Sequence, residues 1–378
     1  MKYRLSDICH YVKGKVDVSE LDNSTYISTE NMLPDKGGVT EAASLPTTLQ
    51  TQIYEKDDVL VSNIRPYFKK IWFADQNGGC SNDVLVFRAN EGVEPGFLYY
   101  VLADDKFFDF SMATSKGTKM PRGDKKALME YEVLDFNIDT QKKVASLLGD
   151  IDEKIRVNTE INDNLEQQAQ ALFNDFFINR NIIPETWKKG SLLDIADYLN
   201  GLAMQKFRPN QTETGIPILK IKELRQGQCD VNSELCSPNI QSKYIVLDGD
   251  VIFSWSGSLL VDFWCGGKCG LNQHLFKVTS SKYDKWFYYS WTKYYLNKFI
   301  TLASSMATTM GHIKRGELAN AEVLIPNEKD YNYIGSLLQP IYDLIISNRL
   351  ENIFLSDLRD TLLPKFMSGE IDVSKIEL

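Results

Sequence analysis

The chain has 378 residues, of which 43% are hydrophobic and 25% charged, and its formal net charge is −9. This composition is typical of a folded globular protein, and the length allows two cores of ordinary domain size. The acidic balance excludes a protein that coats nucleic acid through bulk electrostatics. Any contact with DNA must therefore depend on local basic patches or on a partner.

Two compositional features point to a cytoplasmic protein. No segment approaches the apolar run of about 18 residues that a membrane span requires, and the first thirty residues lack a secretory pattern. The six cysteines are sparse, as expected for free thiols in a reducing compartment. Cys229, Cys236, Cys265 and Cys269 leave a four-thiolate zinc site open, but their spacings are unusual for one, and we predict no metal.

Residues 1–140 predict a mixed α/β domain. Short β-rich runs occupy residues 58–62, 70–74 and 83–87, separated by Pro, Gly and Asn. An aromatic-rich stretch from Pro95 to Phe110 then has helical spacing and opens with a proline suited to a first helical turn.

Residues 141–180 predict a long helix with a coiled-coil seam, because apolar residues recur at alternating spacings of three and four. The predicted seam positions are Leu148, Ile151, Ile155, Asn158, Asn162, Leu165, Leu172 and Phe176. A linker around residues 179–189 follows.

The remaining chain repeats this order. Residues 181–330 predict a second domain, with strands at 250–254, 259–265 and 274–278 and a helix over Trp286 to Ile300. Residues 331–378 predict a second long helical region. Its seam positions are Leu338, Ile341, Ile345, Asn348, Asn352, Leu355, Leu362 and Phe366.

The two halves of the chain correspond to each other at a nearly constant offset. ATSKGTKM at 113–120 corresponds to ASSMATTM at 303–310, and Asn158 and Asn162 correspond to Asn348 and Asn352. We predict an α+β protein with two globular domains, pseudo-two-fold symmetry and two long helices that bury each other's stripes.

Paired asparagines interrupt the middle of each predicted seam. A buried asparagine specifies helix register, because leaving its amide unpaired costs about 1–3 kcal/mol. The alternative is that these positions face solvent at a bend. Gly149 and Pro340 predict that each helical region is broken before its long segment begins.

The sequence lacks the usual signatures of an enzyme. There is no Walker-type glycine loop, no G-x-G-x-x-G after a strand, and none of the three histidines belongs to a duplicated catalytic arrangement. Asp58 and Asp250 are duplicated carboxylates, but each directly precedes a strand, where turn roles are more common. We predict a non-catalytic protein.

Basic and polar residues gather instead on the duplicated loops, where they could contact phosphates and base edges. In the first half the candidates are Ser62, Asn63, Arg65, Lys69, Lys70, Lys116, Gly117, Thr118, Lys119, Arg122, Lys125 and Lys126. In the second half they are Ser254, Trp255, Ser256, Ser258, Thr308, Thr309, His312, Lys314 and Arg315. A further basic cluster adds Lys206, Arg208, Lys220, Lys222 and Arg225. For each residue a solvated surface position is an equally good interpretation, and the clustering favours DNA.

Four motifs resemble the specificity subunits of Type I restriction-modification enzymes. They are GDVIFSWSGS at 249–258, LNQHLFKV at 271–278, AEVLIP at 321–326 and LLPKFMSGEIDV at 362–373. The first half matches more loosely, since DDVLVSNIRPYF lacks the glycines, as expected if the two domains read different sequences.

The resemblance implies a function and a set of partners. Such subunits read a bipartite, asymmetric DNA sequence with two target-recognition domains, separated by an antiparallel coiled coil. They hold two methyltransferase subunits, and two translocase-nuclease subunits join in the restriction complex. S-adenosylmethionine, ATP and Mg would belong to those partners, and none to this chain. The alternatives are a Type IIB-like specificity subunit, a fused nuclease, or a coiled-coil scaffold without DNA readout.

Overall fold

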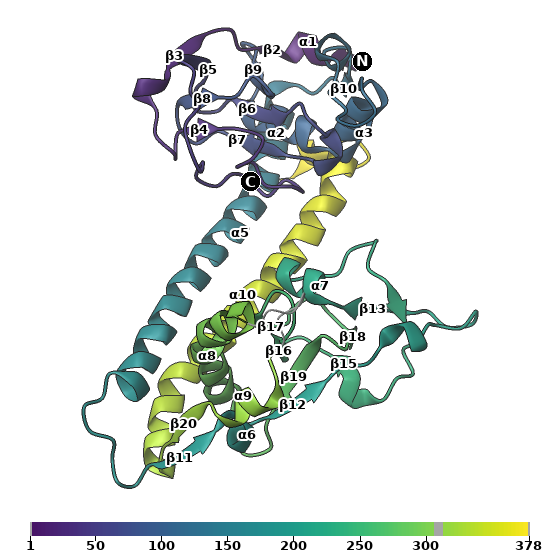
Figure 1. Ribbon diagram of the computed structural model, residues 1–378. Helices are drawn as coiled ribbons and strands as arrows, with labels where there is room; N and C mark the ends of the chain where they lie inside the picture. Colours follow the sequence, from purple (N-terminus) through teal and green to yellow (C-terminus); the bar gives the residue numbers. More distant parts are fainter. Residues whose placement is uncertain (1, 306–312, 377–378) are drawn as a thin grey trace. The chain divides into compact units, whose positions relative to one another are not determined.

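The structure is a computed structural model that describes residues 2–305 and 313–376 (Figure 1). The chain forms two compact units. The first comprises Met1–Lys154 and Leu355–Leu378, and the second comprises Ile155–Phe354. Both long helices contribute one segment to each unit, so each unit is described by itself.

The first unit contains two four-stranded sheets, in the orders β2-β9-β6-β7 and β3-β5-β8-β4, and a two-stranded ladder, β1-β10. All pairs are antiparallel except β4 with β8. The strands are β1 (Lys2–Arg4), β2 (Cys9–Tyr11), β3 (Lys15–Asp17), β4 (Tyr26–Ile27), β5 (Gln50–Tyr54), β6 (Val59–Ser62), β7 (Ile71–Phe73), β8 (Gly78–Cys80), β9 (Val84–Ala89) and β10 (Glu132–Leu134). The short helices are α1 (Leu5–Ile8), α2 (Pro95–Ala103), α3 (Asp105–Ala113) and α4 (Lys125–Leu128).

Strand β6 is buried on both faces, which explains its continuous apolar sequence. Val59 and Val61 belong to the core shared with α2 and α3, whereas Leu60 belongs to the core between the sheets. The single helix predicted over 95–110 is wrong. Asp104 has extended backbone and interrupts it, because its carboxylate accepts a hydrogen bond from the Lys106 amide (3.1 Å) and caps α3.

The second unit repeats this plan with sheets in the orders β12-β19-β16-β17 and β14-β13-β18-β15 and a ladder, β11-β20. Its strands are β11 (Lys188–Ser191), β12 (Asp197–Asn200), β13 (Ile216–Leu219), β14 (Leu235–Cys236), β15 (Ile245–Val246), β16 (Val251–Ser254), β17 (Leu260–Phe263), β18 (Cys269–Leu271), β19 (Leu275–Thr279) and β20 (Glu322–Ile325). Its helices are α6 (Leu192–Ile195), α7 (Ile221–Gln226), α8 (Lys285–Ser305) and α9 (Arg315–Ala319).

Strand β16 matches β6 in its burial. Val251 and Phe253 pack on the helical side, and Ile252 packs in the core between the sheets. The predicted duplication and the α+β class are therefore confirmed.

Two long helices complete both units. Helix α5 (Ile138–Phe173) has 36 residues and α10 (Glu328–Met367) has 40. The predicted breaks at Gly149 and Pro340 are wrong, because both residues lie inside these continuous helices. Pro340 is exposed, so the carbonyl that lacks its amide partner can be hydrated. The helix α5 ends in a π turn, Asn174–Ile178, which contains the predicted seam residue Phe176.

Within each unit the two helices run antiparallel. In the second unit, Asn158 donates to Asn352 Oδ1 and Asn348 donates to Asn162 Oδ1, each at 2.9 Å. In the first unit, Arg359 pairs with Asp152 at 2.8 Å. In these pairs the residue number on α10 falls as the residue number on α5 rises, as it does for antiparallel helices. The four-segment division at residues 140, 180 and 330 stays a prediction.

Candidate nucleic-acid interface

Two candidate loops of the first unit lie side by side. Ile64 forms an isolated β-bridge with Arg122, and the Arg65 amide donates to the Pro121 carbonyl at 2.8 Å. The Gly123 amide donates to the Asn63 carbonyl at 3.3 Å. We call these two loops, residues 63–70 and 114–126, the first-unit ridge.

The second loop of the ridge is a short hairpin with an exposed tip. Lys116 and Arg122 exchange backbone hydrogen bonds of 2.9 and 3.0 Å, and Gly117 has a φ of 96° in the turn between them. Residues 116–120 are all exposed. Thr118 and Lys119 are therefore presented to solvent at the tip.

The first loop of the ridge is held in an unusual backbone conformation. Arg65 and Lys69 have φ values of 51° and 49°, a region that costs a non-glycine residue about 1–2 kcal/mol. The neighbouring segment clamps the loop, since the Lys36 amide donates to the Lys69 carbonyl at 2.9 Å. Such strain persists only where surrounding contacts over-determine it. The loop is therefore held rigidly. It presents the Tyr67 side chain, which is 48% exposed, to solvent.

Ion pairs divide the basic residues of the ridge into two groups. Lys69 pairs with Asp105 at 2.8 Å, Lys116 with Asp124 at 2.6 Å and Arg122 with Asp83 at 3.1 Å. Lys70 donates to the Thr29 carbonyl at 2.6 Å, and burial lowers its pKa. In contrast, Lys119, Lys125 and Lys126 are exposed and form no ion pair with any residue that the structure describes.

Two polar atoms of the first loop are buried without a hydrogen-bond partner. They are Asn63 Oδ1 and Arg65 Nε, within the described part of the chain. Buried polar atoms normally have partners, so each of these requires an explanation. Ser62 differs from them, because its hydroxyl donates to the Ile64 carbonyl at 3.1 Å and braces the turn.

The second unit forms the same turn after β16. The Ser254 hydroxyl donates to the Ser256 carbonyl (3.3 Å) and to the Ser258 carbonyl (2.9 Å), as Ser62 does to Ile64 in the first unit. The Ile313 amide donates to the Trp255 carbonyl at 3.0 Å, the counterpart of the contact from Gly123 to Asn63. The duplicated serine therefore supports the loop in both units.

Sequence reasoning missed three polar residues of this second loop region. His274 Nδ1 lies 3.0 Å from the buried Ser256 hydroxyl, and His274 Nε2 lies 3.3 Å from the Gln273 amide. Asn200 accepts a hydrogen bond from the Trp255 indole at 3.0 Å. The LNQHLFKV motif carried the signal for Gln273 and His274, but as a motif it indicates the family and not the individual contacts.

The remaining candidates of the second unit fall into two places. Arg208 and Lys220 both pair with Glu234, and Lys222 pairs with Asp230 at 2.8 Å, while Lys206 and Arg225 are exposed. Lys314 and Arg315 are exposed where α9 begins. Thr308, Thr309 and His312 lie outside the described residues.

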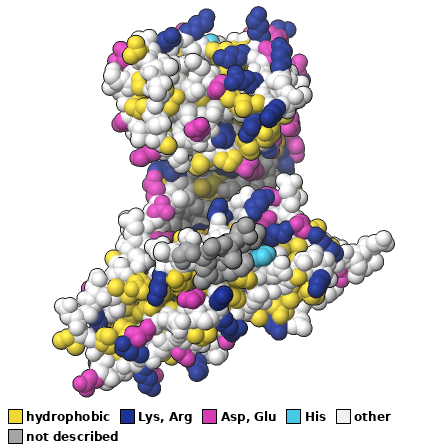
Figure 2. All heavy atoms as spheres, viewed as in Figure 1, with side chains coloured by type: hydrophobic (Ala, Val, Ile, Leu, Met, Phe, Trp, Pro, Cys, Tyr) yellow, Lys and Arg dark blue, Asp and Glu magenta, His cyan; other side chains and the backbone are white. Residues whose placement is uncertain are grey.

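Charges of both signs share the visible surface. On the face in Figure 2, Lys and Arg side chains of the described residues are interspersed with Asp and Glu, without a continuous basic surface. This distribution agrees with the net charge of −9.

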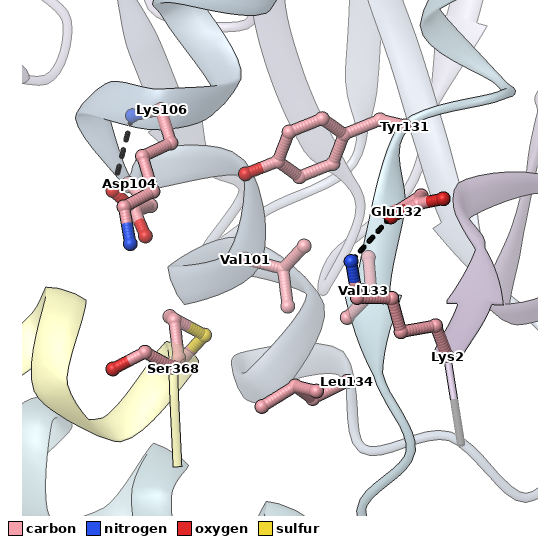
Figure 3. A pocket seen from close by; sticks show the side chains of 10 residues that line it. Lys2, Val101, Asp104, Lys106, Tyr131, Glu132, Val133, Leu134 and Ser368 are labelled. Carbon is pink, nitrogen blue, oxygen red and sulfur yellow. Dashed lines mark hydrogen bonds and ion pairs between the residues drawn. The ribbon is translucent and has the colours of Figure 1, made fainter. Parts of the chain in front are cut away.

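The structure also contains a hollow of about 260 Å³ in the first unit (Figure 3). The Asp104 carboxylate and the Tyr131 hydroxyl face it, and the Lys2–Glu132 ion pair (2.5 Å) lies at its edge. Burial raises the pKa of Tyr131. No histidine or cysteine is among the described residues that line the hollow.

Neither a metal site nor a membrane span emerges from residues 2–305 and 313–376. No group of three or more His, Cys, Asp or Glu in these ranges is placed to hold a metal ion. None of the helices in the same ranges is long and apolar enough to cross a membrane.

Known proteins resemble the chain over three quarters or more of its length. It is 26% identical to the Type I restriction enzyme MjaIX specificity subunit of Methanocaldococcus jannaschii over 310 residues, which cover 76% of this chain and 71% of the relative. It is 20% identical to the HindI specificity subunit of Haemophilus influenzae, covering 98% and 99% of the two chains. The crystal structure of the Type I restriction-modification S subunit from M. genitalium superposes with a TM-score of 0.60 at 14% identity, over 97% and 96% of the two chains, and thus shares the fold.

The profile of one protein family matches the chain twice, at residues 1–167 and 184–353. Each match contains one copy of the two four-stranded sheets and one copy of the turn that Ser62 or Ser254 braces. The chain therefore belongs to the family of Type I restriction modification DNA specificity domains, of which it carries two in tandem.

Proposed function

We propose that this chain is the non-catalytic specificity subunit of a Type I restriction-modification system, and that each unit reads one half of a bipartite, asymmetric DNA target. The single observation that carries the proposal is the double match to the DNA specificity family. Two methyltransferase subunits would be its partners, with two translocase-nuclease subunits in the restriction complex. S-adenosylmethionine, ATP and Mg would be bound by those partners.

The first-unit ridge supplies two kinds of DNA contact in this proposal. Lys119, Lys125 and Lys126 are exposed cations without ion pairs in the described chain, so they would neutralise phosphates. Arg65, which is half-buried, would read a base edge in the major groove, where arginine suits guanine.

The second unit would read its half-site with different chemistry. At the offset that aligns Ser62 with Ser254, Trp255 stands in the place of Asn63 and Gly257 in the place of Arg65. His274 and Gln273 lie beside this loop, and the Gln273 amide suits adenine. Two loops with the same backbone support but different side chains fit a target whose halves differ.

The acidic charge of the chain favours a partner-dependent interaction with DNA. A protein with net charge −9 repels DNA phosphates at long range. The few exposed lysines of the ridge offset this repulsion only weakly. We expect the chain alone to bind DNA weakly, and to bind tightly once the methyltransferase subunits close around the duplex.

The decisive experiment maps adenine methylation in a host that lacks other adenine methyltransferases. The chain is expressed with its cognate methyltransferase subunit, and single-molecule sequencing records modified adenines. We expect one split motif with a modified adenine in each half. A scaffold without DNA readout would leave methylation absent or without any motif, and that result would refute the proposal.

A further inference from the structure

Four charged residues join the second unit's sheet to its segments of the long helices. Arg349 of α10 donates to Asp262 of β17 at 2.6 Å and to Glu166 of α5 at 2.9 Å. Lys293 of α8 donates to the other oxygen of Glu166 at 2.7 Å. We call these residues the joint network. It connects four elements through two carboxylates and two cations.

The joint network is partly shielded from solvent, which makes its geometry well defined. Its four side chains are between 27% and 31% exposed. Burial alone would lower the pKa of Arg349, but Asp262 and Glu166 outweigh it and raise that pKa. Arg349 also reaches the Phe263 carbonyl at 3.4 Å. A planar guanidinium that spans two carboxylates constrains orientation more than a single ion pair does.

Packing next to the joint network differs on its two sides. The rings of Phe263, Tyr289 and Tyr342 pack together, with centroids 4.0 Å apart for Phe263 and Tyr289. Arg349, Asp262 and Phe263 also line a cavity of about 250 Å³, together with α7 residues and the turn that follows them. The buried core holds most of the sheet to α8 and α10. The ion pairs of Arg349 fix the part of the edge strand β17 that borders the cavity.

The first unit has no copy of the joint network. In the register that aligns Asn158 with Asn348, the counterparts of Arg349, Asp262, Glu166 and Lys293 are Thr159, Trp72, Ser356 and Ala103. The two units do share a neighbouring hydrogen bond, because Tyr100 donates to Asp152 at 2.7 Å and Ser290 contacts Tyr342 at 2.9 Å at corresponding positions. The network is therefore an addition in the second unit, and the repeat architecture does not require it.

We propose that the joint network is a positioning device that fixes the second unit's sheet on the helix pair and thereby limits the gap allowed between the two half-sites. This inference rests on the proposed function, since a gap has meaning only if both units read DNA. Without the ion pairs, the β17 edge of the sheet would shift relative to α10. The second recognition loop would then engage half-sites displaced by one base pair, while the bases it reads would not change.

The test compares methylation maps of the full-length chain with its methyltransferase partner for wild type and Arg349→Met. Methionine retains an apolar stem and removes the charge. We expect both half-site sequences to be unchanged and methylation at sites with a gap one base pair longer or shorter to rise about tenfold, equivalent to about 1.4 kcal/mol of lost discrimination. Arg349→Lys should restore part of the discrimination.

The matched control is Lys189→Met, which removes an exposed ion pair with Glu322 (2.8 Å) in the same unit. It should retain the wild-type gap. If Arg349→Met unfolds, Lys293→Met removes only the outer member and serves in its place. An unchanged gap in a folded variant, an altered half-site sequence, or equal relaxation in the control would overturn the inference. If wild type methylates no split motif, the proposed function itself fails.

Discussion

Replacing Asn348 by leucine should destabilise the second unit, because it leaves the Asn162 Oδ1 atom buried without its donor. Asn348 and Asn162 are 8% and 7% exposed, and the hydrogen bond between them is 2.9 Å long. An unpaired buried polar group costs about 1–3 kcal/mol. For a unit of this size, each kcal/mol corresponds to about 2–4 °C in Tm.

The double variant Asn162→Leu/Asn348→Leu should behave differently. It removes both polar groups and adds apolar contact across the same two helices, so its stability should equal or exceed that of wild type. The coupling in the double-mutant cycle should reach about 1–3 kcal/mol. Scanning calorimetry of the full chain, which resolves separate transitions, provides the measurement.

A matched control lies on the exposed side of the same helix. Leu344 of α10 is 45% exposed, and Leu344→Asn should change Tm little. The reasoning would be refuted if Asn348→Leu alone were as stable as wild type, or if the double variant lost as much stability as the sum of the single variants.

Three further predictions concern other contacts. The triple variant Lys119→Ala/Lys125→Ala/Lys126→Ala in the methyltransferase complex should weaken DNA binding without altering the methylated motif. Binding titrations at several salt concentrations should show that the slope of log K against log salt is reduced by about 3. An altered motif would show instead that these lysines read bases. The side chain of Asp58 is 1% exposed and accepts two hydrogen bonds from Arg88, at 2.7 and 2.8 Å, whereas Arg88 is 32% exposed and also pairs with Glu55 at 3.1 Å. Asp58→Asn should lower the Tm of the first unit by about 3 °C or more, because a hydrogen bond to a charged group is worth about 1.5–3 kcal/mol; an unchanged calorimetric transition would contradict this. The hydrogen bond from the Lys116 ammonium, together with those from the Ala127 and Lys126 amides, lowers the pKa of Asp124 to about 2. The contribution of Asp124 to stability is therefore present above the unfolded carboxyl pKa of about 3.9 and is lost as the pH falls toward 2. An acid titration of the hairpin followed by NMR should show a single step in wild type over that interval and none in Asp124→Asn, and identical curves would exclude the assignment.

Local patterns in the sequence predicted most of the architecture. The period of 3–4 along residues 148–172 and 338–362 defines amphipathic helices whatever their surroundings, because side-chain spacing follows directly from helix geometry. The β-rich runs at residues 58–62 and 250–254 likewise predicted the strands β6 and β16, and the structure showed that both faces of each are buried. Breakers were less reliable, since Gly149 and Pro340 lie inside long helices whose tertiary contacts outweigh local propensity.

The candidate site was only partly visible in the sequence. Counting basic residues identified the two loops of the first unit, but it could not distinguish Lys69, which pairs with Asp105, from Lys119, which has no ion-pair partner among the described residues. Ser62 and Ser254 looked like contact residues because they are duplicated, and in the structure their hydroxyls brace turns.

The sequence by itself determined the duplication, the helix stripes and the strands, because each depends on residues near one another in the chain. Only the tertiary structure decided which charges pair and which face outward. Arg349 lies 87 residues from Asp262 and 183 residues from Glu166 in the sequence, and nothing in their local sequence specifies that they meet. The energy of an ion pair depends on distance and burial in the folded chain, and those quantities exist only once distant segments pack together.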